Sequence, residues 1–249
     1  MKIKFRSIEL FGVPGSGKTF LRQIIKKRLI REGYMVFDTR EIIILYIGRF
    51  IKTNLYEKIL LSYFSFILRL DIKTTLWNSR LSKICEKYLL KNQKKYLFFK
   101  KKTDEFFFKN NVTKFNYHYI WIKELIIANI IFDELKKYNK KIIFFPDEGF
   151  VQRIFLLYYL KKKNLGSVIK KYLKNKIFCE SIISIKTKKK DLIRINNIKK
   201  NKKFGWVLKD EEIKNMLLLE KKIKKNKYFK FKVLKNYKNI GDQINKLIY

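Results

Sequence analysis

The chain has 249 residues, of which 47% are hydrophobic, so it can bury one sizeable core and still carry an insertion. Length and composition together exclude a short peptide, a long repeat array and a disordered chain, although 33% of the residues are charged. The formal net charge is +39, from 60 Lys and Arg against 21 Asp and Glu.

Lysine carries most of this charge, because the chain has 50 Lys, 10 Arg and a single Ala, with Ile, Asn, Phe and Tyr also abundant. These residues are encoded by A/T-rich codons, so codon bias is the simplest explanation of the charge, and whether the high lysine content is functional stays open. A dedicated nucleic-acid-binding protein more often concentrates Arg, which can make paired hydrogen bonds to phosphate and guanine. The composition therefore argues against a nucleic-acid function, while it predicts anionic ligands and a weak attraction to acidic membrane surfaces.

The cysteines and the apolar runs bear on the compartment. Cys85 and Cys179 lie far apart without CxxC spacing, and His118 is the single histidine, so the sequence supports neither a disulfide framework nor a zinc site. The N-terminus resembles a strand rather than a signal peptide. The longest apolar runs, 42–51 and 59–70, fall short of the ~18 uncharged residues that a spanning helix needs. We therefore expect a cytoplasmic protein whose membrane contact is at most peripheral.

A glycine-rich motif follows the first predicted strand. A short strand-like run at Phe5–Phe11 leads into the pattern GxxxxGKT, and apolar spacing from Thr19 to about Glu32 predicts a helix directly after it. The motif residues are Gly12, Val13, Pro14, Gly15, Ser16, Gly17, Lys18 and Thr19. A plain turn linking strand and helix is the alternative, but the complete GKT ending favours nucleotide binding.

The residue types of this motif suit a nucleoside triphosphate. Glycines let successive backbone N–H groups face a phosphate, and the helix N-terminus adds partial positive charge. Lys18 is expected to bridge the β- and γ-phosphates, and the Thr19 hydroxyl is expected to ligate Mg²⁺. ATP and Mg²⁺ are therefore the expected ligands, although the motif does not distinguish ATP from GTP.

Acidic residues follow the next two predicted strands. The second strand, Tyr34–Phe37, ends at Asp38, and the third, Lys140–Phe145, leads to Asp147 and Glu148. Carboxylates at the carboxyl end of a parallel strand can hold the Mg²⁺ shell or take a proton from an attacking hydroxyl. A capped turn is the alternative for the Asp-Glu-Gly segment, because Asp and Gly favour turns for local reasons.

Between these strands, about 42–138 shows helical apolar spacing and many aromatic residues, which predicts an insertion of about four helices. Its position suits a cap over an acceptor pocket, and most of the aromatic residues are expected to form its core. Lys94–Lys102, with three aromatic residues, could stack nucleobases or touch a membrane surface. His118 could act as a base, but a histidine without partners is more often structural.

The last part of the chain predicts two more strands. Ser181–Lys186 is followed by the basic segment Lys188–Arg194, which could close over phosphates or form a solvated lysine face. Arg194 is the last of ten arginines and is the better candidate for a functional role. Phe229–Leu234 is the fifth strand, with a C-terminal helix after it. The pattern indicates an α/β fold, with a doubly wound, mostly parallel five-stranded sheet of the P-loop NTPase type and a helical insertion, in one domain over 1–249.

With GVPGSGKT at 12–19, acidic residues after two strands and Arg194 in a basic segment, the chain resembles a P-loop kinase of the nucleoside/nucleotide kinase-like group. Thymidylate, adenylate and shikimate kinases belong to this group. The resemblance covers about 1–40 and 138–249. It implies a Mg-ATP donor, an acceptor beneath a helical cap, and a lid arginine that neutralises the transferring phosphoryl group.

The resemblance also implies roles for individual residues. Residues 12–19 match the phosphate-binding loop, Asp38 matches the acid that binds the acceptor or acts as base, and Arg194 matches the lid arginine. Asp147 and Glu148 match the third-strand acidic site. Thymidylate kinases carry an Asp-Arg pair there and deoxynucleoside kinases Glu-Arg-Ser, whereas this chain has Asp-Glu-Gly, and no second arginine lies close to Arg194. The identity of the acceptor therefore stays open.

The sequence thus predicts an ATP-dependent phosphotransferase that acts on a small hydroxylated or phosphorylated acceptor. Lys18 and Mg²⁺ would stabilise the spreading charge, and Asp38 or Asp147 would orient or deprotonate the acceptor. Glu148 would support the metal shell, while Arg194 would cover the phosphates. The alternative is a P-loop ATPase, a nucleotide-dependent switch acting on a macromolecular partner, because P-loop folds host both activities. The oligomeric state stays open.

Overall fold

The structure is a computed structural model, and it divides the chain into two compact units. The first unit comprises residues 1–32 and 147–249, and the second comprises residues 33–146. The residues that the structure describes are 6–51, 55, 56, 58, 59, 62, 63, 77–92, 94–108, 117–153, 155, 179–201, 208–225 and 231–234.

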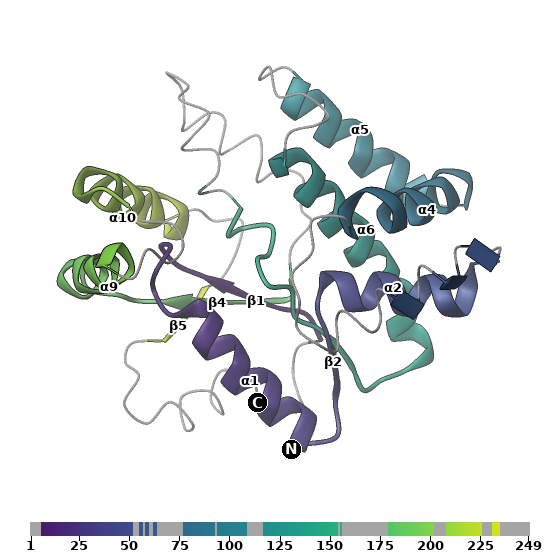
Figure 1. Ribbon diagram of the computed structural model, residues 1–249, viewed down its shortest axis with the longest axis horizontal. Helices are drawn as coiled ribbons and strands as arrows, with labels where there is room; N and C mark the ends of the chain where they lie inside the picture. The colour runs from purple at the N-terminus through teal and green to yellow at the C-terminus, as the bar shows by residue number, and fades with distance from the viewer. Residues whose placement is uncertain are drawn as a thin grey trace. The chain divides into compact units, whose positions relative to one another are not determined.

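A parallel sheet forms the centre of the first unit (Figure 1). Its strands are β1 (Ile8–Phe11), β4 (Ser181–Ile185) and β5 (Phe231–Leu234), in the order β1-β4-β5. The register places Ile8 opposite Ser181 and Ile182 opposite Phe231. Every residue of β1 and β4 is buried, which is typical of a parallel strand covered on both faces.

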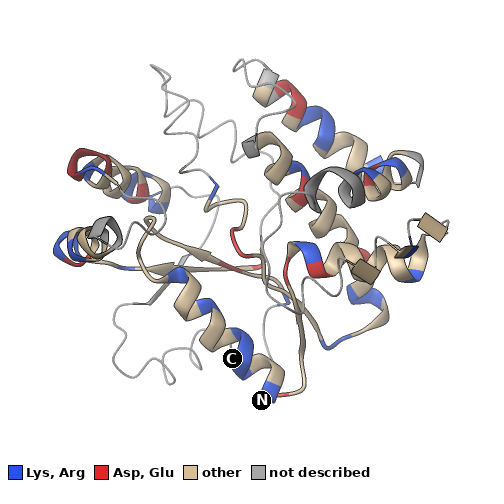
Figure 2. Cartoon of the chain, in the orientation of Figure 1, with Lys and Arg blue, Asp and Glu red and all other residues tan. Residues whose placement is uncertain are grey.

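Three helices belong to the first unit: α1 (Lys18–Arg31), α9 (Lys189–Asn201) and α10 (Asp210–Lys224). α1 contacts β1 and buries Leu21, Ile25 and Leu29, which recur every four residues and so share one face. α9 and α10 contact each other (Figure 1). The first turn of α10 is acidic and its last turn is basic, so both ends carry the charges that its dipole favours (Figure 2).

The second unit combines a pair of parallel strands with helices. Met35 lies opposite Ile142 in the strand pair, and the Phe145 N–H donates to the Phe37 carbonyl at 2.8 Å. α6 contacts α2, α4, α5 and β3, and it is buried on nearly every side, as expected of a central helix. The elements are β2 (Met35–Phe37), α2 (Thr39–Phe50), α4 (Trp77–Asn92), α5 (Lys94–Phe108), α6 (Tyr117–Tyr138) and β3 (Ile142–Phe144).

Two partly buried carboxylates connect the helices of the second unit. Glu86 of α4 accepts hydrogen bonds from Tyr96 Oη of α5 at 3.0 Å and from Lys123 Nζ of α6 at 2.8 Å. Tyr119 Oη of α6 donates to Asp104 of α5 at 2.6 Å. Burial raises the pKa of both tyrosines, and the neighbouring carboxylates raise it further, so both hydroxyls remain donors. Polar bonds therefore reinforce the apolar packing of these helices.

The expected α/β class with parallel strands is confirmed, and the bounds of the described strands agree with the prediction to within three residues. That all five strands belong to one sheet stays a prediction, because the described ladders are β1-β4-β5 and β2-β3. The basic segment that begins at Lys188 is helical from Lys189 onward. The expected C-terminal helix lies outside the described residues, as does the start of the fifth strand. None of the described helices combines the length and apolar character that crossing a bilayer requires.

Candidate nucleotide site

The phosphate-binding motif forms a closed loop between β1 and α1. Gly15 and Gly17 have φ angles of 89° and 83°, which lie in the left-handed region that favours glycine. The Ser16 N–H donates to the Val13 carbonyl at 3.0 Å and so closes the turn. Gly17 occupies the N-cap of α1, where no side chain caps the helix and the first turn has no acidic residue. Backbone donors and the positive end of the helix dipole are thus available to an anion.

Lys18 spans this loop. Its Nζ donates to the Gly12 carbonyl at 2.8 Å and to the Val13 carbonyl at 3.1 Å. The ammonium group is therefore held over the start of the loop by two backbone acceptors and is part-buried. A cation held in this way could transfer its hydrogen bonds to the oxygens of an anion bound at the loop.

A hollow of about 780 Å³ opens beside the loop. α9 lies against the loop, since side-chain atoms of Leu192 and Ile195 are 3.9 and 4.0 Å from the position that a Cβ would take on Gly15. Four cationic side chains and one carboxylate line the hollow, so its field favours anions. Its lining residues are Ser16, Gly17, Phe20, Lys186, Thr187, Lys188, Lys190, Asp191, Arg194 and Ile195.

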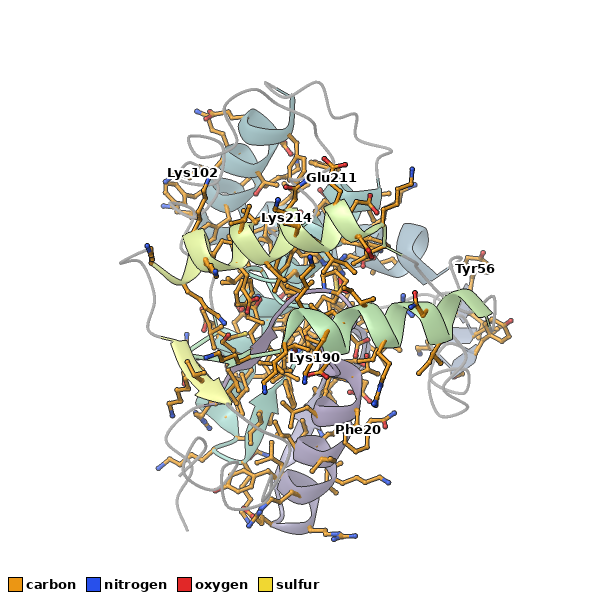
Figure 3. The ribbon with its side chains drawn as sticks, turned by 90° about the vertical axis from the view of Figure 1, so that its left-hand side faces the viewer. Phe20, Tyr56, Lys102, Lys190, Glu211 and Lys214 are labelled. Carbon is orange, nitrogen blue, oxygen red and sulfur yellow. The ribbon has the colours of Figure 1, made fainter. Side chains whose placement is uncertain are left out.

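Arg194 is the expected lid arginine, and it shares this hollow with Ser16 and Gly17 of the loop. Figure 3 shows Phe20 on α1 and Lys190 on α9, the two helices that contribute side chains to it. Phe20 is 60% exposed, although it is a large apolar residue next to the loop. The hollow therefore combines cations with one open aromatic surface.

The two acidic residues after the third strand each form an ion pair with an arginine. Asp147 pairs with Arg22 Nη1 of α1 at 2.6 Å, and Glu148 pairs with Arg153 Nη1 at 3.1 Å. Both carboxylates remain largely exposed, at 62% and 46%. Among the described residues, no cluster of three or more His, Cys, Asp or Glu side chains suits a metal ion. Mg²⁺ bound here would thus rely on the exposed Thr19 hydroxyl, phosphate oxygens and water, which is a common set for this ion.

Asp38 has a structural role in the second unit. It is the N-cap of α2, and its Oδ1 accepts from the Arg40 and Glu41 N–H groups, both at 2.8 Å. Glu41 Oε2 accepts from the Asp38 N–H at 2.7 Å and completes a capping box. Asp38 Oδ1 is therefore engaged with the helix terminus. Its predicted catalytic role stays a prediction, since Asp38 and the phosphate-binding loop belong to different units.

Two residues of importance, Glu9 and Gln152, were not singled out by the sequence. Glu9 is fully buried in β1, and its Oε1 accepts from the Gln152 N–H at 2.6 Å. Gln152 is also buried, and its Oε1 accepts from the Gly12 N–H at 3.1 Å. A glutamate in an otherwise apolar strand was the available signal, because an unpaired charge at such a position has a high desolvation cost.

The surroundings of Glu9 leave little space and little water. A methyl group on Gly149 would overlap the Glu9 side chain, so glycine is required at that position. Burial raises the pKa of Glu9 to about 8, although the backbone N–H groups of 150–152 and the Arg153 guanidinium act in the opposite direction. Glu9 is therefore protonated in the folded protein over a pH range in which an exposed glutamate is ionised.

This raised pKa predicts how stability depends on pH. Between about pH 4.5 and 8, the folded protein binds a proton at Glu9 that the unfolded chain releases. The stability gained from this proton is fully present below about pH 4.5 and is lost as the pH rises through about 8. For one proton the slope is up to about 1.4 kcal/mol per pH unit. We expect Glu9→Gln to remove this slope in urea unfolding at pH 5, 6.5 and 8.

The exposed Glu105 supplies the matched control for that experiment. Glu105→Gln should leave the difference between pH 5 and pH 8 as it is in the wild-type protein. An identical pH dependence in wild type and Glu9→Gln would show that Glu9 is ionised in the folded state.

The structure therefore brings Ser16 and Gly17 of the loop together with Arg194 at one hollow in the first unit, and it places Asp147 and Glu148 on the same unit in arginine pairs. Comparisons of this chain with protein-family models, with curated proteins and with solved structures found no match.

Proposed function

We propose that the protein is an ATP-dependent phosphotransferase of the P-loop kinase type that acts on a small hydroxylated or phosphorylated acceptor. The observation that supports this function is the cationic hollow beside a glycine-rich loop whose lysine is already held over the loop carbonyls. Loop, helix terminus and cations together suit three linked phosphates better than a single anion.

In this proposal each residue of the chain has a defined task. The loop N–H groups and Lys18 bind the β- and γ-phosphates, and Arg194 covers the phosphoryl group from α9. Thr19 would hold Mg²⁺, which neutralises phosphate charge when bound. Asp147 would take part in the metal shell or orient the acceptor by exchanging its Arg22 pair for those partners, and Glu148 would support it.

The finer fold proposal is a single doubly wound, five-stranded sheet of the P-loop NTPase type. Both described ladders are purely parallel, and the connections between paired strands contain helices. Parallel strands joined by helices are the usual construction of such a sheet. The helices of the second unit would then form the cap over the acceptor, with Asp38 as its acidic residue.

Phe20 offers a way to separate nucleotide binding from simple phosphate binding. Its exposed ring lines the hollow, so we expect it to stack on the base or ribose of ATP. Phe20→Ala should weaken Mg-ATP binding about tenfold, since stacking on one base contributes about 1–3 kcal/mol, and should leave tripolyphosphate binding unchanged. Calorimetric titration of both ligands measures the difference.

Ile30→Ala is the matched control, because Ile30 is an exposed apolar residue of the same helix that does not line the hollow. It should bind both ligands like the wild type. Equal losses for ATP and tripolyphosphate in Phe20→Ala would mean that the ring only supports the loop.

The proposed function is tested by incubating the purified protein with Mg-ATP and a mixed metabolite extract. ADP and new phosphorylated species are followed together by mass spectrometry. A new phosphometabolite that depends on the protein establishes a kinase and identifies its acceptor. ADP formed without a new phosphometabolite indicates the alternative, a P-loop ATPase that switches a macromolecular partner. If neither ADP nor a phosphometabolite forms, both the kinase and the ATPase are contradicted.

A further inference from the structure

The loop that holds the phosphates is tied to a distant turn by a buried side chain. The Gly12 N–H, at the start of the loop, donates to Gln152 Oε1 at 3.1 Å. Gln152 lies 140 residues later in the chain, in the segment that follows Asp147-Glu148-Gly149. The same segment bonds back to β1, because the Gln152 N–H donates to Glu9 Oε1 at 2.6 Å. The turn thus contacts β1 and the loop at points only three residues apart.

We propose that Gln152 is a positioning residue of the phosphate-binding loop and that Glu9 holds Gln152 in place. The inference rests on the proposed nucleotide site. Gln152 does not line the hollow, so it acts through the backbone of Gly12 rather than on the ligand.

The tight packing around Gly12 explains why this bond sets the loop. A Cβ on Gly12 would come within 2.8 Å of Ser16 Oγ and 3.3 Å of the Ile185 carbonyl, so the backbone has little freedom to move. Gly12 is buried, and a buried N–H without an acceptor costs roughly 1–3 kcal/mol. Without the Gln152 acceptor, the loop would have to open toward solvent to satisfy this donor.

Such opening would also displace the groups that bind phosphate. The Gly12 carbonyl is an acceptor of Lys18 Nζ at 2.8 Å, so rotation of the peptide at Gly12 changes the position of the lysine. Glu9 limits this rotation from the other side, since its carboxyl group fixes the Gln152 backbone and its side chain packs against Gly149. The hydrogen bond from the Gly12 N–H to Gln152 therefore also fixes the position of the Lys18 ammonium group over the loop.

Gln152→Met tests this role, because methionine has a similar length and no amide acceptor. We expect residue-resolved amide hydrogen exchange to be at least about tenfold faster at Gly12 in this variant, and affinity for Mg-tripolyphosphate to fall about tenfold. The midpoint of urea unfolding is measured in parallel, so that loss of the folded state is not mistaken for loss of binding. Gln23→Met, at an exposed glutamine of α1, is the matched control and should change none of these readouts.

Faster exchange at Gly12 together with weaker tripolyphosphate binding in a folded Gln152→Met protein supports the proposal. Unchanged affinity overturns it, whether or not exchange becomes faster. If the variant does not fold, the wild-type protein still decides, because a Gly12 amide that exchanges as fast as exposed loop amides shows that the bond is absent. Failure of the wild type to bind either Mg-ATP or tripolyphosphate would instead overturn the proposed function, before any variant is compared.

Discussion

Replacing Lys18 by alanine is expected to abolish phosphate transfer from Mg-ATP, with a loss in turnover of at least about a hundredfold. The side chain is part-buried and is held over the loop by the Gly12 and Val13 carbonyls. In the proposed mechanism its ammonium group would exchange these acceptors for the phosphates. The negative charge on the phosphoryl oxygens spreads during transfer, and a cation fixed beside them stabilises that state more than the ground state. The measurement is ADP formation under saturating Mg-ATP.

The control for this experiment comes from the same helix. Lys27 is an exposed lysine of α1, so Lys27→Ala removes the same charge without touching the loop. It should retain the wild-type rate, which separates the local role of Lys18 from the effect of a net charge lowered by one. Wild-type turnover in a folded Lys18→Ala protein would contradict the phosphotransferase mechanism.

Gly149→Ala is expected to lower the free energy of unfolding by about 3 kcal/mol or more, because overfilling a packed interior typically costs 1–3 kcal/mol and here little can yield. The new methyl group would occupy the space of the Glu9 side chain, which is fully buried. Relief requires the turn to move away from β1, and the bond between the Gln152 N–H and Glu9 would be lost with it. Urea unfolding at pH 6.5 measures the change.

Gly48→Ala serves as the matched control, since nothing lies within 4 Å of the Cβ that alanine would add there. Gly48 is an exposed residue within α2, so alanine should stabilise the protein by roughly 0.5–1 kcal/mol through its helix propensity. The two glycine substitutions should therefore change the free energy of unfolding in opposite directions. A Gly149→Ala protein as stable as the wild type would show that the turn does not pack on Glu9.

The local features of the fold could be predicted from the sequence because short-range rules determine them. The glycines and the GKT ending predict the loop at 12–19, and apolar residues spaced four apart predict the helix α1. β4 is an apolar run with β-branched residues, which a buried parallel strand requires. Each of these predictions depends on residues within one segment.

The features that the sequence did not predict depend on partners far along the chain. The local sequence does not reveal the hydrogen-bond partner of Glu9, because the N–H group that donates to its carboxyl group belongs to Gln152, 143 positions later. The Arg22 pair with Asp147 has the same origin, since neither residue indicates the other locally. Asp38 is a different case, because its capping box is visible in the local sequence as Asp-Thr-Arg-Glu. The cap does not test the catalytic role predicted for Asp38, which stays a prediction.

The parallel ladder of β1 has a consequence for the order in which the protein assembles during synthesis. β1 pairs with β4, whose first residue, Ser181, faces Ile8 across a separation of more than 170 positions. The second unit is continuous, by contrast, and the β2-β3 pair and the contacts among α2, α4, α5 and α6 join residues within 33–146. During synthesis the second unit can therefore pack its helices before β4 is available to pair with β1. The loop at 12–19 precedes the second unit in the chain, yet on this view it would be completed only after that unit. If the loop binds ATP as proposed, ATP added to stalled nascent chains should find a binding site only once β4 has emerged.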